Sequence, residues 1–204
     1  MRPASFFALV LIAALTIPAF AQAPPAAPPT RIRGTVEKLT DHTLTVNARD
    51  GKVVTVTLAP DFTVRAVVAK TLADIKPGDK VGITSIKGPS DTRQAIEIHI
   101  LPANIPNLRL SEFPSDLRPG SLMTNAAVAQ VSTLPTGQSI KVSLNGKESE
   151  ITVPPDAAIV GYGPGDPNLL RPGTAVVVFA RKQADGSLAA PSVTAEKDGV
   201  KPPM

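Results

Sequence analysis

The feature of this sequence that most limits its fold is an alternation of apolar and polar residues with a period of two. The alternation runs through 42–48, 52–59 and 93–101. It is typical of antiparallel strands that bury one face. The segments are separated by turn signals such as Asp50-Gly51 and Pro77-Gly78-Asp79. We expect strands at 31–39, 42–48, 52–59, 79–87 and 93–101, an extended piece at 62–68, and one helical turn at Leu72–Ile75. Gly34 lies inside the first of these strands, where glycine is typical of a bulge or sharp bend.

The same unit occurs a second time. Gly51-Lys52 and Gly146-Lys147 lie 95 residues apart, as do Pro77-Gly78 and Pro172-Gly173. The pair Val36 and Val131 has the same spacing, which indicates an internal repeat. A single unit of this size buries only about 60% of its unfolded surface, so we expect the two to pack together. Five strands with a helical insert after the third predict an all-β fold of two tandem small OB-like Greek-key β-barrels packed together.

These patterns divide the chain into six segments. They are a signal peptide at 1–21, a Pro/Ala-rich spacer at 22–30, a first barrel at 31–101, a linker at 102–120, a second barrel at 121–197 and a polar tail at 198–204. The linker is polar and rich in proline, and we expect it to pack across the barrels. The spacer favours an extended conformation because proline removes backbone donors.

The N-terminus has the three parts of a secretory signal. Arg2 is the positive residue, Phe6–Phe20 is the apolar stretch, and Ala19-Phe20-Ala21 matches an A-x-A cleavage site. An uncleaved anchor is the alternative. With cleavage we expect a periplasmic or secreted protein that does not span a membrane, because no later segment has the length of a span.

Composition excludes several classes of function. The chain has no Cys, so disulfides, thiolate metal sites and Cys nucleophiles are impossible. Aromatic residues make up 3% and Trp is absent, which disfavours nucleic-acid binding through stacked bases. The two histidines, His42 in a turn and His99 on an outward strand face, have no G-x-S-x-G motif beside them. We therefore expect both histidines to be solvated, no catalytic residues, no cofactor and no enzyme activity.

A divalent metal is the one cofactor that the residues suggest. Glu97 and His99 are two apart on one strand, so their side chains project from the same face. His42, or Asp41 beside it, would add a further ligand if its hairpin lies close, since zinc sites use three or four ligands. The alternative is an ordinary polar outer face.

The loop Gly161–Asp166 is the most unusual candidate for contact with a partner. Tyr162 offers a flat amphipathic surface, and Gly163 beside it allows close approach of another backbone. The alternative is a turn in which Tyr162 fixes the loop onto the barrel.

Several segments together resemble a known family. They are RIRGTVEKL, LTVNARDGKVVTVTL, LADIKPGDKVGI, QAIEIHILP, DLRPGSLMTNAAV, VPPDAAIVGYGPGD and the C-terminal RKQADGSLAAPSVTAEKDGVKPPM. This series resembles exported bacterial proteins of unknown function with tandem OB-like barrel repeats, in a subgroup labelled as metal ABC transporter permease. The resemblance implies a periplasmic accessory or binding module and supplies no catalytic residue.

Three hypotheses follow. The first is a non-enzymatic periplasmic binding or accessory module whose partner is an unidentified periplasmic protein or small ligand. The second is a metal-binding accessory protein linked to metal transport, using Glu97, His99 and His42. The third is an assembly partner recognised through a barrel edge or the Tyr162 loop.

Overall fold

In this computed structural model the described residues are 28–89, 92–103, 105, 108–134 and 137–202. The predicted signal peptide, and the spacer up to residue 27, lie outside them. The elements of the first half are β1 (Thr30–Thr40), β2 (Thr43–Ala48), β3 (Val53–Ala69), the 3₁₀ turn η1 (Leu72–Asp74), β4 (Lys80–Lys87), β5 (Arg93–Ile100) and β6 (Ser111–Pro114). Those of the second half are β7 (Leu122–Leu134), β8 (Gly137–Leu144), β9 (Lys147–Val153), β10 (Ala158–Pro164), the 3₁₀ turn η3 (Pro167–Leu169), β11 (Ala175–Lys182) and β12 (Leu188–Ala195).

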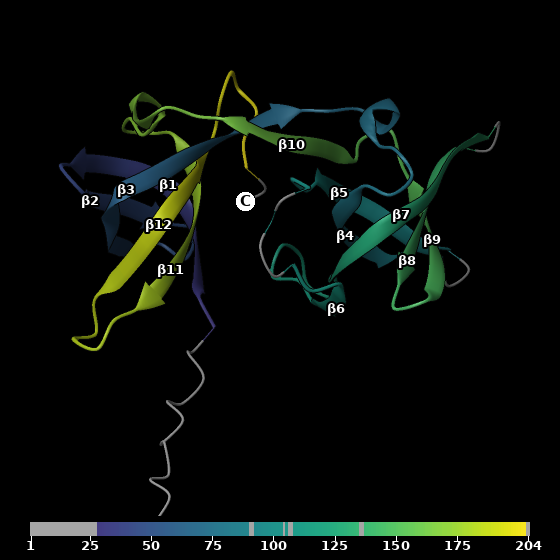
Figure 1. Cartoon of the computed structure of the whole chain (residues 1–204), viewed down its shortest axis with the longest axis horizontal. Helices are drawn as coiled ribbons and strands as arrows, with labels where there is room; N and C mark the ends of the chain where they lie inside the picture. Colours follow the sequence, from purple (N-terminus) through teal and green to yellow (C-terminus); the bar gives the residue numbers. More distant parts are fainter. Residues whose placement is uncertain (1–27, 90–91, 104, 106–107, 135–136, 203–204) are drawn as a thin grey trace, which may run out of the picture.

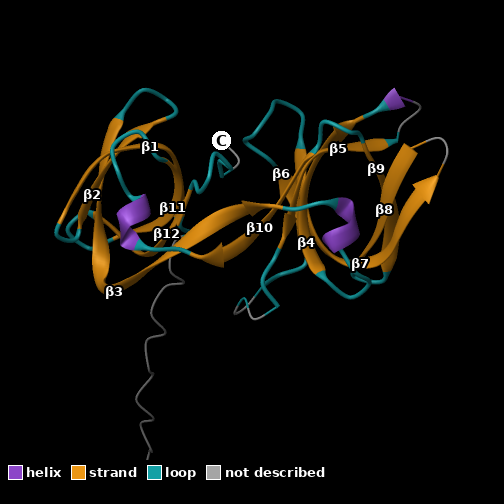
Figure 2. Ribbon diagram, turned by 90° about the horizontal axis from the view of Figure 1, so that it is seen from above, coloured by secondary structure: helices purple, strands orange, loops and turns teal. Residues whose placement is uncertain are grey.

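The strands close into two five-stranded barrels that lie side by side (Figures 1 and 2). Barrel A is the ring β1-β2-β3-β12-β11, in which only the β3–β12 pair is parallel. Barrel B is the ring β7-β8-β9-β5-β4, in which only the β5–β9 pair is parallel. The OB-like all-β fold predicted from the sequence is therefore present, with β6 and β10 outside the rings.

The barrels are not the two continuous segments 31–101 and 121–197 expected from the sequence. Barrel A takes its first three strands from the first half of the chain and its last two from the second half, while barrel B does the reverse. The physical reason is the length of β3. It continues without a break through 62–68, still pairs with β12 of barrel A as far as Ala66, and carries the chain toward barrel B at its end (Figure 1).

The crossover is a two-stranded ribbon made by the end of β3 and by β10. These two segments pair antiparallel, with Val67 opposite Tyr162, and these two positions have the spacing of the sequence repeat. Because equivalent positions face each other, the ribbon lies on a local two-fold axis. The elements on either side follow it: η1 and η3, β4 and β11, and β5 and β12 all begin and end at this repeat spacing.

One marker of the repeat is shifted. The backbone N–H of Val36 donates to the carbonyl of Thr174, and in barrel B the N–H of Val128 donates to the equivalent carbonyl of Asp79. Val36 therefore corresponds to Val128 and not to Val131. The first strand of each unit follows a different register from the rest of the repeat.

Each barrel has its own apolar core. The core of barrel A includes Leu44, Val46, Val56 and Leu58, the inward residues that the alternation predicted. The core of barrel B includes residues of β4, β5, β7, β8 and β9, and is closed at one end by Leu72 and Ile75 around η1. The predicted helical turn, which follows β3 of barrel A, thus packs against the core of barrel B.

Gly34 does not lie at a bulge. The register shift of β1 lies further on, between Val36 and Lys38. A Cβ atom at Gly34 would lie 2.1 Å from the backbone oxygen of Asn47, well inside van der Waals contact. Glycine is needed here because the backbone of the paired strand β2 lies very close to β1 at this point.

The linker and the tail both fold back between the barrels. Asp116 of the linker forms ion pairs with Arg31 and Arg33 of β1, so the linker packs across the barrels as expected. Val200 of the tail forms a short bridge with Lys197 just before it, and Pro202 is buried. Within the described part of the chain, no helix is long and apolar enough to cross a membrane.

Candidate functional site

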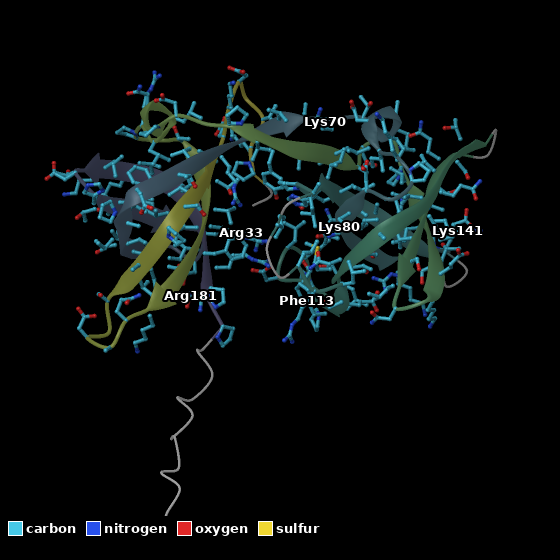
Figure 3. The ribbon with its side chains drawn as sticks, in the orientation of Figure 1. Arg33, Lys70, Lys80, Phe113, Lys141 and Arg181 are labelled. Atoms are coloured by element: carbon cyan, nitrogen blue, oxygen red, sulfur yellow. The ribbon has the colours of Figure 1, made fainter. Side chains whose placement is uncertain are left out.

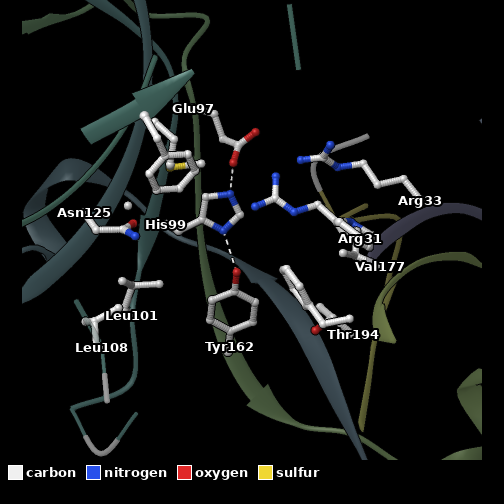
Figure 4. A pocket seen from close by; sticks show the side chains of 15 residues that line it. Arg31, Arg33, Glu97, His99, Leu101, Leu108, Asn125, Tyr162, Val177 and Thr194 are labelled. Carbon is white, nitrogen blue, oxygen red and sulfur yellow. Dashed lines mark hydrogen bonds and ion pairs between the residues drawn. The ribbon is translucent and has the colours of Figure 1, made fainter. Parts of the chain in front are cut away.

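A cavity of about 260 Å³ lies between the two barrels (Figure 4). Its walls come from β1, β11 and β12 of barrel A, from β4, β5 and β7 of barrel B, and from β6, β10, the linker and the tail. The lining surface is mostly apolar, although about half of the lining residues are polar. The apolar or small ones are Gly82, Leu101, Leu108, Phe113, Met123, Val177, Phe179 and Pro202, and the polar ones are Arg31, Arg33, Glu97, His99, Asn125, Tyr162 and Thr194.

On one wall, three side chains form a linear hydrogen-bonded chain. The carboxyl group of Glu97 contacts Nε2 of His99, and Nδ1 of His99 lies 2.6 Å from the hydroxyl of Tyr162. The imidazole and phenol rings lie end to end across this hydrogen bond, with 5.8 Å between their centroids and 21° between their planes. Glu97 and His99 are only 3% and 9% exposed. Glu97 and His99 are buried because the outer face of β5 lies against barrel A and β10.

Burial shifts the protonation of all three groups. Loss of hydration raises the pKa of Glu97 to about 8 and lowers that of His99 to about 4, the cations Arg33 and Arg31 adding to the shift of His99. Burial, followed by the nearby Glu97, raises the pKa of Tyr162 to about 12. At neutral pH the Glu97–His99 pair therefore holds one proton more than a carboxylate beside a neutral imidazole would hold.

The opposite wall is cationic. Arg31 lies 3.0 Å from Asp116 and places its guanidinium 5.2 Å from the centre of the Phe179 ring. Arg33 also pairs with Asp116, and this hydrogen bond, ahead of the nearby charges, lowers the pKa of that carboxyl. Two guanidinium groups thus share one carboxylate. Figure 3 shows Arg33 and Phe113 on the inner sides of the two barrels, with Lys141 on the far side of barrel B.

The structure brings together two of the three predicted metal ligands. Glu97 and His99 share one face of β5, as the spacing predicted, but this face is buried, so the expectation of a solvated His99 is wrong. His42 lies in the β1–β2 turn and packs edge-on against Phe62, not against this pair. Among the described residues, no three His, Asp or Glu side chains are grouped as metal ligands. The hairpin of His42 lies in barrel A, whereas β5 belongs to barrel B, which is why the set is not assembled.

Tyr162 and Gly163 lie on strand β10, not in a free loop. The hydroxyl of Tyr162 is bound to His99, and its ring lines the cavity. This arrangement agrees better with the alternative, in which the Tyr162 ring fixes its segment to a barrel, than with a freely exposed contact residue.

Sequence reasoning missed the cationic wall. Arg31, Arg33 and Asp116 are far apart in the sequence, and single charged residues of this kind are usually solvated. The one available signal was the strand alternation, which places Arg31 and Arg33 on the outward face of β1, opposite the core residue Ile32. Alternation does not predict the exchange of strands that brings this face of β1 against barrel B.

No family model, curated protein or solved structure matches the chain. The assignment of a function therefore depends on the geometry of the cavity.

Proposed function

We propose that the protein is a non-enzymatic periplasmic binding module that holds a small, largely apolar molecule between its two barrels. The observation that carries this proposal is the cavity of about 260 Å³ with walls from both barrels. Apolar linings with a few convergent polar groups are typical of ligand sites, and such sites are frequent at interfaces between domains. The periplasmic location rests on the export signal at 1–21.

The polar wall supplies a hydrogen-bonding group for a ligand. Tyr162 lines the cavity together with Glu97 and His99, and burial raises the pKa of its phenol to about 12. The phenol therefore keeps its proton at neutral pH, as a hydrogen-bonding group of a binding site does.

The experiment is a titration of the protein with 1-hexanol, followed by the methyl NMR signals of Leu101, Leu108 and Met123. We expect saturable shifts at these methyl groups. Val177→Phe places a ring in the cavity, and we expect it to weaken binding by about tenfold or more, since a filled site loses the contacts that hold the ligand.

The matched control is Val53→Phe. Val53 is 62% exposed at the start of β3 and does not line the cavity, so this variant should bind as the parent does. Shifts that spread over the whole surface, or that Val177→Phe leaves unchanged, would contradict the proposal.

A further inference from the structure

We propose that the ligand of this cavity is an amphipathic carboxylate whose anionic group binds between the Arg31 guanidinium and the Tyr162 hydroxyl, and that binding requires the proton held by the Glu97–His99 pair. This inference rests on the proposed function and specifies its ligand. Two observations support it: the charged groups in the cavity walls, and the donors and acceptors of the hydrogen-bonded chain Glu97–His99–Tyr162.

The charge of the walls favours an anion. Arg31 and Arg33 both line the cavity, and the side chain of Asp116, which pairs with them, is 60% exposed. The Glu97–His99 pair carries no net charge while it holds its proton. The guanidinium of Arg31 therefore lies in a largely apolar surround, where an anionic group of a ligand is favoured.

The hydrogen-bond chain has one donor to spare when the pair holds its proton. If the proton is on Glu97, the carboxyl donates to Nε2 of His99, and the neutral imidazole donates from Nδ1 to the Tyr162 oxygen. If the proton is on His99, Nε2 donates to the carboxylate and Nδ1 again donates to Tyr162. In both arrangements the O–H of Tyr162 is left to donate elsewhere. A carboxylate oxygen in the cavity is a suitable acceptor.

Loss of this proton reverses the chain. The neutral imidazole then donates from Nε2 to the Glu97 carboxylate, so Nδ1 becomes an acceptor and takes the Tyr162 O–H. The cavity loses its donor and gains a negative charge. Both changes weaken the binding of an anion, so ligand affinity and proton affinity are linked.

The groups that surround the pair are consistent with this linkage. Arg31 and Arg33 face it from β1, Asp116 acts on it from the linker, and Tyr162 caps it from β10. Arg65 of β3 adds a positive field at Tyr162. The pKa of Asp116 is lowered and that of Tyr162 is raised to about 12, so neither group changes its proton content between about pH 7 and pH 9.

The experiment compares hexanoate with 1-hexanol, two probes of equal chain length, by NMR titration at about pH 6.5. We expect hexanoate to bind about tenfold more tightly than hexanol. Tyr162→Phe should weaken hexanoate about tenfold and leave hexanol nearly unchanged, since only the carboxylate needs the donor. Hexanoate affinity should fall about tenfold between about pH 7 and pH 9.

Glu97→Gln is the decisive variant. Its amide can donate permanently to Nε2 of His99, so the Tyr162 O–H stays available at every pH. We expect the hexanoate affinity of Glu97→Gln to lose its dependence on pH between about pH 7 and pH 9. Equal binding of hexanol and hexanoate, or an unchanged pH profile in Glu97→Gln, would overturn this inference alone. Failure of both probes to bind would overturn the proposed function with it.

Discussion

The two barrels contain the same ring of five strands, yet the faces that they turn toward each other differ in chemistry. Barrel B has Glu97 and His99 on β5 where barrel A has Ser192 and Thr194 on β12. Gly82 on β4 of barrel B corresponds to Val177 on β11 of barrel A, and His99, Thr194, Gly82 and Val177 all line the cavity.

The first strands differ in the same way. Arg33 pairs with Val177 in barrel A, and Asn125 pairs with Gly82 in barrel B, so Arg33 and Asn125 are equivalent. By the same register Arg31 is equivalent to Met123. The inward residues of both barrels stay apolar, because each must close a core. The apolar inward residues that both barrels have therefore determine the fold, and the outward residues in which the barrels differ form the candidate site.

The largest effect that distinguishes the barrels is expected at Gly34. Its register equivalent is Ala126, which is fully buried and already carries a Cβ. Gly34→Val would drive side-chain atoms into the backbone of β2 and should lower the free energy of unfolding by about 4 kcal/mol or more. Ala126→Gly is the matched change and should cost about 1 kcal/mol. Urea unfolding followed by circular dichroism measures both changes. Equal losses of unfolding free energy would show that the close approach of β2 to β1 at Gly34 is not special to barrel A.

The next effect tests whether the barrels unfold independently. Ile98 is fully buried in the core of barrel B, but its strand belongs to the first half of the chain. Ile98→Ala should lower the free energy of unfolding by about 3 kcal/mol. Because each barrel needs strands from both halves, we expect one cooperative transition that shifts as a whole. A second transition that stays at the position of the parent protein would contradict this coupling.

The smallest of the three effects is a pH dependence of stability that arises from one barrel only. The pKa of Glu97 is raised from 4.5 to about 8, and that of His99 is lowered from 6.5 to about 4. Between about pH 4.5 and 6.5 the two linkages oppose each other, because the folded Glu97 retains a proton that the unfolded one has lost, while the unfolded His99 gains one. Above pH 6.5 only Glu97 contributes, and the folded state binds more protons.

Stability should therefore fall by about 2 kcal/mol as the pH rises from about 6.5 to 8. Thermal unfolding across this range measures the loss. Glu97→Gln should abolish it, whereas Ser192→Ala, at the equivalent position of barrel A, should leave it intact. A slope that persists in Glu97→Gln would place the titrating group elsewhere.

The local pattern was sufficient to locate most strands of the first half of the chain. Residues such as Val56 and Leu58 had to face a core because alternation fixes which face of a strand is apolar, and Asp50-Gly51 fixes where the chain turns back. The repeat spacing identified Pro172-Gly173 as the counterpart of Pro77-Gly78, but the short strand β6 inside the expected linker was not predicted. Alternation also correctly placed Glu97 and His99 on one face of β5.

Pairing partners, and with them the site, were decided by the tertiary structure. Two copies of one unit offer the same strand edges, so alternation alone does not tell whether β3 pairs with β5 or with β12. The unbroken β3 selects β12 by carrying the chain out of barrel A. Only that exchange brings the outward faces of β1 and β5 together, which buries His99 and sets it opposite Arg31. A strand's sequence determines its apolar face, whereas burial of its polar face depends on which neighbour covers it.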